Sequence, residues 1–186
     1  MFKWIRKSTL DPLAVSMTGV KLADRLLVVG CSDPQLIAAL SAKVGLTGRA
    51  CAVDEDPARA ESAARIAERE GVLIESAPAP GLCLPYPDES FDVVVVREIG
   101  SSAMTQSGSP VFREAHRVLR PGGRCVAIRG EPRGGIASLL AGSPPSQSDA
   151  LTSVFHAAGF LAVRTLAERD GVLYLEGVKP ARQTSA

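Results

Sequence analysis

The stretch Arg25-Leu26-Leu27-Val28-Val29-Gly30, followed directly by Cys31-Ser32-Asp33-Pro34, decides the fold class of this 186-residue chain. A continuous apolar run that ends in glycine is typical of a strand buried on both faces of a parallel sheet. Asp33 and Pro34 then predict the start of a helix, because aspartate can cap exposed amides and proline suits the first helical position. The sequence therefore predicts a strand, a sharp turn and a helix in direct succession.

The same succession recurs along the chain. Residues 49–53 predict a second strand, and Asp56-Pro57 repeats the capped start for a helix that ends at Gly71. Further strands are predicted over residues 72–75, 91–96 and 124–129, further helices over 109–120 and 149–158, and an irregular connection over 76–90. Residues 160–166 and 172–178, joined by an Asp170-Gly171 turn, predict a terminal hairpin. Strands joined through helices or long connections imply a mostly parallel sheet.

Composition excludes several classes of protein. Lys and Arg number 21 against 20 Asp and Glu, and this net charge of +1 argues against a nucleic-acid-binding protein, which needs a basic stripe. The apolar core Val93–Val96 is far shorter than the roughly 20 residues of a transmembrane helix. The four cysteines are too widely spaced to predict a metal site. We therefore expect a reduced, cytoplasmic protein.

Three local stretches carry a family resemblance. They are the approach to the fourth strand at residues 84–92 (LPYPDESFD), the helix-to-strand turn at residues 116–123 (HRVLRPGG), and residues 157–160 (AAGF) before the hairpin. Together they make residues 18–179 resemble the class I S-adenosylmethionine-dependent methyltransferase family. The resemblance implies an α/β, Rossmann-like three-layer sandwich with a mostly parallel seven-stranded sheet and a C-terminal antiparallel hairpin. Residues 1–17 are then an N-terminal segment, and residues 180–186 a disordered tail.

The resemblance also implies where S-adenosylmethionine binds, since ligands of open α/β sheets lie beyond the carboxyl ends of the strands. The expected cofactor contacts after the first strand are Gly30, Cys31, Ser32 and Asp33. After the second strand, Asp54 is placed to accept hydrogen bonds from both ribose hydroxyls, with Glu55 beside it; the alternative for Asp54 is a solvated turn acid. At an exposed turn, Asp54→Ala is expected to weaken cofactor binding by about 1.5–3 kcal/mol and leave the fold intact.

Candidates for chemistry on the methyl acceptor lie at the end of the predicted fourth strand. Glu98 is the candidate general base, although a surface carboxylate is an equally good interpretation, and Arg97 is a candidate contact to the cofactor. His116 and His156 lie on predicted helices, where we expect them to pack or face solvent. The Gly- and Ser-rich segments 100–109 and 130–148 are expected to choose the acceptor, but their composition favours no substrate class. We expect a small-molecule acceptor because one domain accounts for the sequence.

The cofactor loop departs from the family pattern of Gly-x-Gly-x-Gly, because Ser32 and Pro34 occupy the second and third glycine positions. Two hypotheses therefore stay open: methyl transfer to a small-molecule acceptor, and a catalytically impaired binding or assembly module on the same fold. A nicotinamide-dependent oxidoreductase is a third and weaker hypothesis. Its Gly-x-Gly-x-x-Gly loop would need glycine at Ser32 and Gln35. The sequence does not indicate an oligomeric state.

Overall fold

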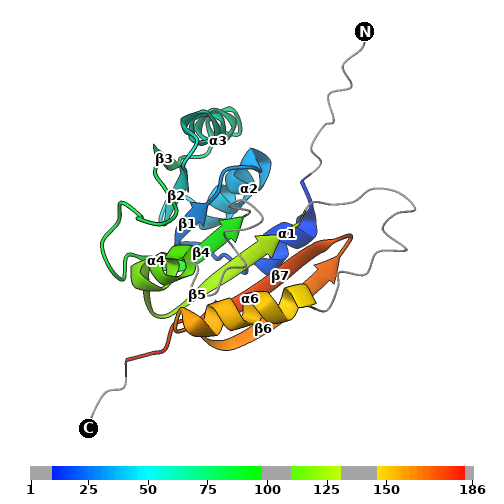
Figure 1. Ribbon diagram of the computed structural model, residues 1–186. Helices are drawn as coiled ribbons and strands as arrows, with labels where there is room; N and C mark the ends of the chain where they lie inside the picture. The colour runs from blue at the N-terminus through cyan, green and yellow to red at the C-terminus, as the bar shows by residue number, and fades with distance from the viewer. Residues whose placement is uncertain (1–9, 98–109, 131–145, 183–186) are drawn as a thin grey trace.

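The apolar runs of the sequence lie side by side in one sheet. The computed structural model describes residues 10–97, 110–130 and 146–182, which contain a seven-stranded sheet of order β3-β2-β1-β4-β5-β7-β6 (Figure 1). Its strands are β1 (Arg25–Val29), β2 (Arg49–Asp54), β3 (Glu75–Pro78), β4 (Phe91–Arg97), β5 (Leu119–Arg129), β6 (Leu161–Arg169) and β7 (Val172–Val178). The helices are α1 (Pro12–Met17), α2 (Pro34–Val44), α3 (Pro57–Arg69), α4 (Pro110–Val118) and α6 (Ser146–Ala157).

The strand directions confirm the expected α/β class. β1 pairs in parallel with β2 and with β4, and the parallel ladder continues from β2 to β3 and from β4 to β5. β7 runs antiparallel to both β5 and β6. The hairpin turn has φ of 53° at Asp170 and 82° at Gly171. Two consecutive positive φ values are those of a type I′ turn, which an Asp-Gly pair favours.

Helices cover both faces of the sheet, which gives three layers (Figure 1). α4 and α6 pack on one face, and α1, α2 and α3 pack on the other. Successive strand residues therefore alternate between two apolar clusters: Val94 and Val96 of β4 belong to the first, and Val93 and Val95 to the second. Burial on both faces explains why these strands read as unbroken apolar runs. No helix within the described ranges is long and apolar enough to span a bilayer.

The helix starts follow the expected chemistry. The Asp33 carboxylate accepts a hydrogen bond from the Leu36 amide at 3.1 Å, and Asp56 caps α3 in the same way. α1 was not predicted, although Asp11 caps it and Pro12 is its first residue. α1 packs against α2. The signal that predicts α2 and α3 is thus also present at α1.

Two strand boundaries differ from the prediction. The third strand was expected over residues 72–75, but β3 covers Glu75–Pro78 and pairs with the carboxyl half of β2. The apolar run before it is a connection in which Leu73 is 80% exposed. Pro78 is tolerated because β3 is an edge strand, where a missing amide costs no ladder bond. β5 begins at Leu119 rather than at residue 124, with an irregularity opposite Phe91 and Val93.

The stretch that carries much of the family resemblance is held in place by α4. Arg117 donates hydrogen bonds to the carbonyls of Leu84 and Tyr86, at 3.1 and 2.9 Å. Glu114 accepts one from the Leu84 amide at 2.8 Å. The Tyr86 ring then packs edge-on against Phe91, with ring centroids 5.0 Å apart. These conspicuous residues therefore fix the entry to β4.

Candidate cofactor-binding site

The carboxyl ends of β1 and β2 are joined through one carboxylate. Asp54, the last residue of β2, has its Oδ2 2.7 Å from the amide nitrogen of Cys31, which follows β1 by two residues. Its Oδ1 accepts a second hydrogen bond, from the Asp56 amide at 2.9 Å. The expected juxtaposition of the loop after β1 with position 54 is therefore present, and it is a direct contact.

The surroundings of Asp54 differ from the sequence-based expectation. Asp54 is only 5% exposed, so the alternative interpretation of Asp54 as a solvated acid at an exposed turn is wrong. Arg59 of α3 lies above it, with Nη1 3.9 Å from Oδ2. Because the carboxylate holds two backbone amides in a buried position, its removal must also affect the fold.

The loop after β1 turns at its first residue. Gly30 has φ of 95°, a left-handed conformation that glycine adopts without strain, and its amide donates to the Val53 carbonyl at 2.8 Å. The Cys31 side chain is buried in the core, so this residue contributes only its backbone to the loop. Burial also raises the pKa of the Cys31 thiol to about 12. Ser32 and Glu55 are exposed. These two polar side chains are therefore available at the rim.

An ion pair ties the same loop to β4. Arg97, the last residue of β4, has Nη2 3.4 Å from Oδ2 of Asp33. The other Asp33 oxygen caps α2. Arg97 Nε is buried and has no hydrogen-bond partner among the described residues. β1 lies between β2 and β4, so Asp54 and Arg97 hold its loop from the two neighbouring strands.

Comparison with known proteins assigns this arrangement to a family. A family model described as a methyltransferase domain matches residues 27–127, more than half of the chain. The chain belongs to the methyltransferase-domain family. The methyltransferase family that the sequence resembled is thereby confirmed.

Named relatives of this methyltransferase domain include two curated proteins. The 27-O-demethylrifamycin SV methyltransferase of Amycolatopsis mediterranei is 37% identical over 116 residues, which cover 61% of this chain and 41% of that protein. The 2-phytyl-1,4-naphtoquinone methyltransferase of Synechococcus elongatus is 29% identical over 119 residues, which cover 62% of this chain and 50% of that protein. The chain thus spans about half the length of these relatives.

A solved structure shares the fold of this methyltransferase domain. The SAM-dependent methyltransferase from Aquifex aeolicus superposes with a TM-score of 0.71 and 18% sequence identity. The match covers 90% of this chain and 88% of that chain. At this identity the likeness shows the fold alone.

The residues of the methyltransferase domain fit its cofactor chemically. A carboxylate offers about four lone-pair sites, and two backbone amides occupy only two of those on Asp54, so it retains capacity for hydroxyl donors. Only Gly30 has a positive φ within residues 30–34, so Ser32 and Pro34 cause no backbone strain where the family usually has glycine. Pro34 is the first residue of α2, a position that needs no amide for the helix.

Other candidate residues of the domain are distributed as follows. Glu98, the proposed general base, lies outside the described residues, as do most of the two Gly- and Ser-rich segments. His116 packs edge-on against Phe160, with ring centroids 5.1 Å apart, and burial lowers its pKa. His156 is exposed. Both histidines therefore match their expected packing or solvent-facing roles.

Arg129, the last residue of β5, was not among the predicted site residues. Its Nη1 is buried without a hydrogen-bond partner among the described residues. A signal was available, because a basic residue ends β5 just as Arg97 ends β4. Arg129 therefore lies at the carboxyl end of its strand, and ligands of open α/β sheets bind beyond these ends.

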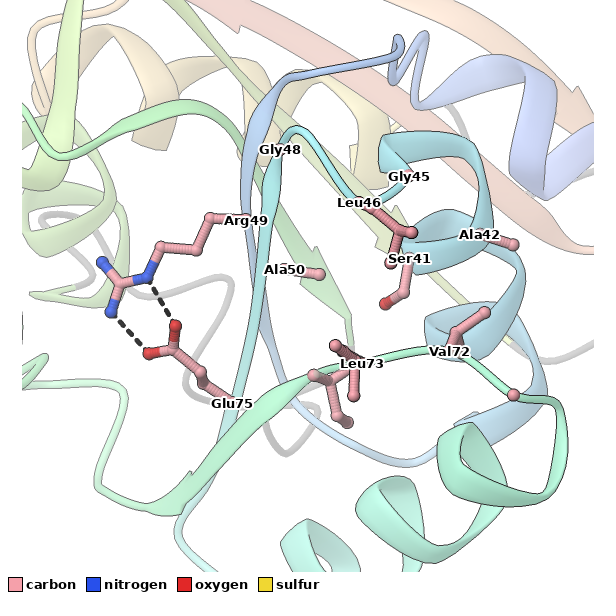
Figure 2. A pocket seen from close by; sticks show the side chains of 12 residues that line it. Ser41, Ala42, Gly45, Leu46, Gly48, Arg49, Ala50, Val72, Leu73 and Glu75 are labelled. Carbon is pink, nitrogen blue, oxygen red and sulfur yellow. Dashed lines mark hydrogen bonds and ion pairs between the residues drawn. The ribbon is translucent and has the colours of Figure 1, made fainter.

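A groove elsewhere in the domain is distinct from this site. It has a volume of about 610 Å³ and lies at the amino ends of β2 and β3, where Arg49 and Glu75 face each other (Figure 2). Leu46 and Leu73, 90% and 80% exposed, also line it. Because Gly30 and Asp54 lie at the carboxyl ends of β1 and β2, this groove is at the opposite end of the sheet from the cofactor site.

Proposed function

We propose that the chain transfers a methyl group from S-adenosylmethionine to a small-molecule acceptor. The contact between the Cys31 amide and Asp54 carries the proposal, since it brings the two expected cofactor-binding segments together at the strand ends in a member of a methyltransferase family. Two relatives are named as methyltransferases of a rifamycin and of a phytylnaphthoquinone, both small molecules. By this analogy the acceptor belongs to the same broad class.

The chain's own residues divide the work of binding. Asp54 and the exposed Glu55 would accept hydrogen bonds from the cofactor's ribose hydroxyls. The backbone at Gly30 and the hydroxyl of Ser32 would face the methionine part, with Arg97 as a positive contact whose position Asp33 fixes. When bound, the cofactor supplies an activated methyl group on a sulfonium.

The protein's main contribution to rate would be alignment. Holding an acceptor atom in line with the methyl group can supply roughly 7–11 kcal/mol through proximity and orientation. A base is needed only where the acceptor loses a proton on attack, and Glu98 is the residue we propose for that role. Loss of turnover in Glu98→Gln, with cofactor binding kept, would be the result expected of a base.

Calorimetry with S-adenosylmethionine and S-adenosylhomocysteine tests the cofactor assignment. We expect saturable binding of both ligands. Binding should be weaker in Gly30→Ala, because φ is 95° at this position and a residue with a β-carbon adopts that conformation only with strain. Heat from neither ligand at millimolar concentration would refute the proposal. Binding of both ligands without transfer of a labelled methyl group to any of a broad panel of hydroxylated small molecules would favour the impaired binding module.

A further inference from the structure

Arg129 differs from the other partly buried arginines of the sheet. Arg124 on the same strand has Nη1 3.5 Å from Glu176, and Arg25 on β1 has Nε 3.1 Å from Asp92. Arg129 is also partly buried, but it forms no ion pair with any residue that the structure describes, and its Nη1 is buried without a hydrogen bond. Among the residues that the structure describes, its guanidinium therefore has no carboxylate partner, unlike those of Arg124 and Arg25.

A partly buried cation without a partner favours an anion. Burial removes water from the Nη1 end of the guanidinium, and a hydrogen-bonded anion compensates for that loss. Arginine is suited to such a partner because its planar group binds a carboxylate or phosphate through two parallel hydrogen bonds. The environment of Arg129 therefore selects for an oxyanion.

The strand register fixes the face of the sheet from which Arg129 projects. Its ladder partner is Leu173, a member of the apolar cluster under α4 and α6. Arg97 pairs with Ile128, which belongs to the opposite face, so the two arginines project to different faces. Directly after Arg129, Gly130 has φ of 100° and lies too close to the Gly171 carbonyl for any β-carbon.

Two positively charged residues thus lie at the carboxyl ends of the neighbouring strands β4 and β5. Arg97 pairs with the loop that would hold the cofactor, whereas Arg129 lies one strand further from that loop, at the end of β5. We propose that Arg129 binds a carboxylate or phosphate group of the methyl acceptor, so that the acceptor is an anionic small molecule. This inference rests on the proposed methyl-transfer function.

The test uses three probes of similar shape, because the acceptor is unidentified. Benzoate and phenyl phosphate carry the two oxyanions, and benzamide is a neutral analogue of benzoate. NMR titration of the full chain follows the Nε–Hε signal of Arg129 and gives a dissociation constant for each probe. The variant Arg129→Met removes the charge and keeps much of the stem. Arg65→Met, on an exposed position of α3, is the matched control for a lost positive charge.

We expect at least one anion to bind the unmodified chain and the Arg65→Met control equally, and to bind Arg129→Met roughly 10- to 100-fold more weakly, as loss of a charged hydrogen bond implies. Benzamide should bind the unmodified chain more weakly by a similar factor. The proposal would be overturned if Arg129→Met bound the anions as tightly as the unmodified chain does. It would also be overturned if the unmodified chain bound benzamide as tightly as benzoate. Should Arg129→Met fail to fold, Arg129→Lys keeps the charge and loses the planar group. It should then bind benzoate several-fold more weakly, and unchanged binding would again overturn the proposal.

Binding of S-adenosylhomocysteine to the same samples separates this inference from the proposed function. Equal binding to the unmodified chain and to Arg129→Met is expected. Weaker binding to Arg129→Met would assign the arginine to the cofactor and overturn the anionic-acceptor proposal. An absence of S-adenosylhomocysteine binding in every sample refutes the proposed function, even where benzoate still depends on Arg129.

Discussion

Asp54→Asn is the substitution whose consequences follow most directly from the structure. The carboxylate bonds the Cys31 and Asp56 amides, one on each oxygen, at a residue that is 5% exposed. Asparagine keeps the shape but offers one oxygen, so its amino group must face one of the two amide donors. A charged hydrogen bond contributes about 1.5–3 kcal/mol and a neutral one about 0.5–1.5 kcal/mol. The loss of one charged bond and the weakening of the other together predict a fall of about 2.5–4.5 kcal/mol in unfolding free energy.

Thermal and urea unfolding measure this effect. For a domain of this size, 1 kcal/mol corresponds to roughly 2–4 °C in midpoint, so Asp54→Asn should lower the midpoint by roughly 5–18 °C. Glu55→Gln is the matched control, because it removes the neighbouring charge at an exposed position and should change stability by less than about 0.5 kcal/mol. Equal stability of Asp54→Asn and Glu55→Gln would refute the reasoning. A destabilised Asp54→Asn that binds S-adenosylhomocysteine normally would leave Asp54 a purely structural link.

Three further predictions concern other parts of the fold. Burial would raise the pKa of Asp92, but hydrogen bonds from two half-exposed arginines outweigh this effect and lower the pKa from 3.8 to about 2. The ionised carboxylate therefore stabilises the fold by about 1–2 kcal/mol after screening above pH 4, and this contribution is lost as the pH falls to about 2. Acid unfolding of Asp92→Asn should lack this pH-dependent loss. Gly130→Ala should lose about 3 kcal/mol or more of unfolding free energy because its β-carbon meets the Gly171 carbonyl, whereas Gly71→Ala, with open space around it, should lose only about 1–2 kcal/mol; equal losses would contradict the clash. In the folded protein a thiol reagent should modify only Cys83, and a second fast thiol would contradict the burial of Cys31, Cys51 and Cys125.

Local chemistry was sufficient to predict most of the sheet and its helices. The runs at residues 25–30 and 91–96 are buried on both faces, and such strands have no competing polar pattern. The cap-and-proline starts at Asp33 and Asp56 use only neighbouring residues, so they are visible in the sequence. The Asp170-Gly171 turn is equally local.

The third strand was misplaced because its position depends on a partner. Val72, Leu73 and Ile74 have the composition of a strand, yet the ladder with β2 begins one residue later, at Glu75 opposite Cys51. A short apolar run cannot by itself distinguish a strand from an exposed connection. Only the register against β2 decides between them.

The candidate site shows the same division. That the loop after β1 and the end of β2 lie together follows from the parallel pairing of these strands, and the family resemblance implied it. The burial of Asp54 and the ion pair between Asp33 and Arg97 depend on side chains from three strands and their loops, so no local pattern contains them. Arg129 was missed because an unpaired charge becomes visible only when its surroundings are known.

The altered cofactor loop is best understood through what holds its shape. In a glycine-rich loop, freedom from β-carbons lets the backbone approach a ligand. Here only Gly30 uses that freedom, and carboxylates supply the remaining constraints: Asp54 binds the Cys31 amide, while Asp33 caps α2 and pairs with Arg97. A loop held by such bonds is ordered before any ligand arrives, which lowers the entropic cost of binding. The departure from the family pattern therefore changes how the loop is held, and the contact between the ends of β1 and β2 does not require the missing glycines.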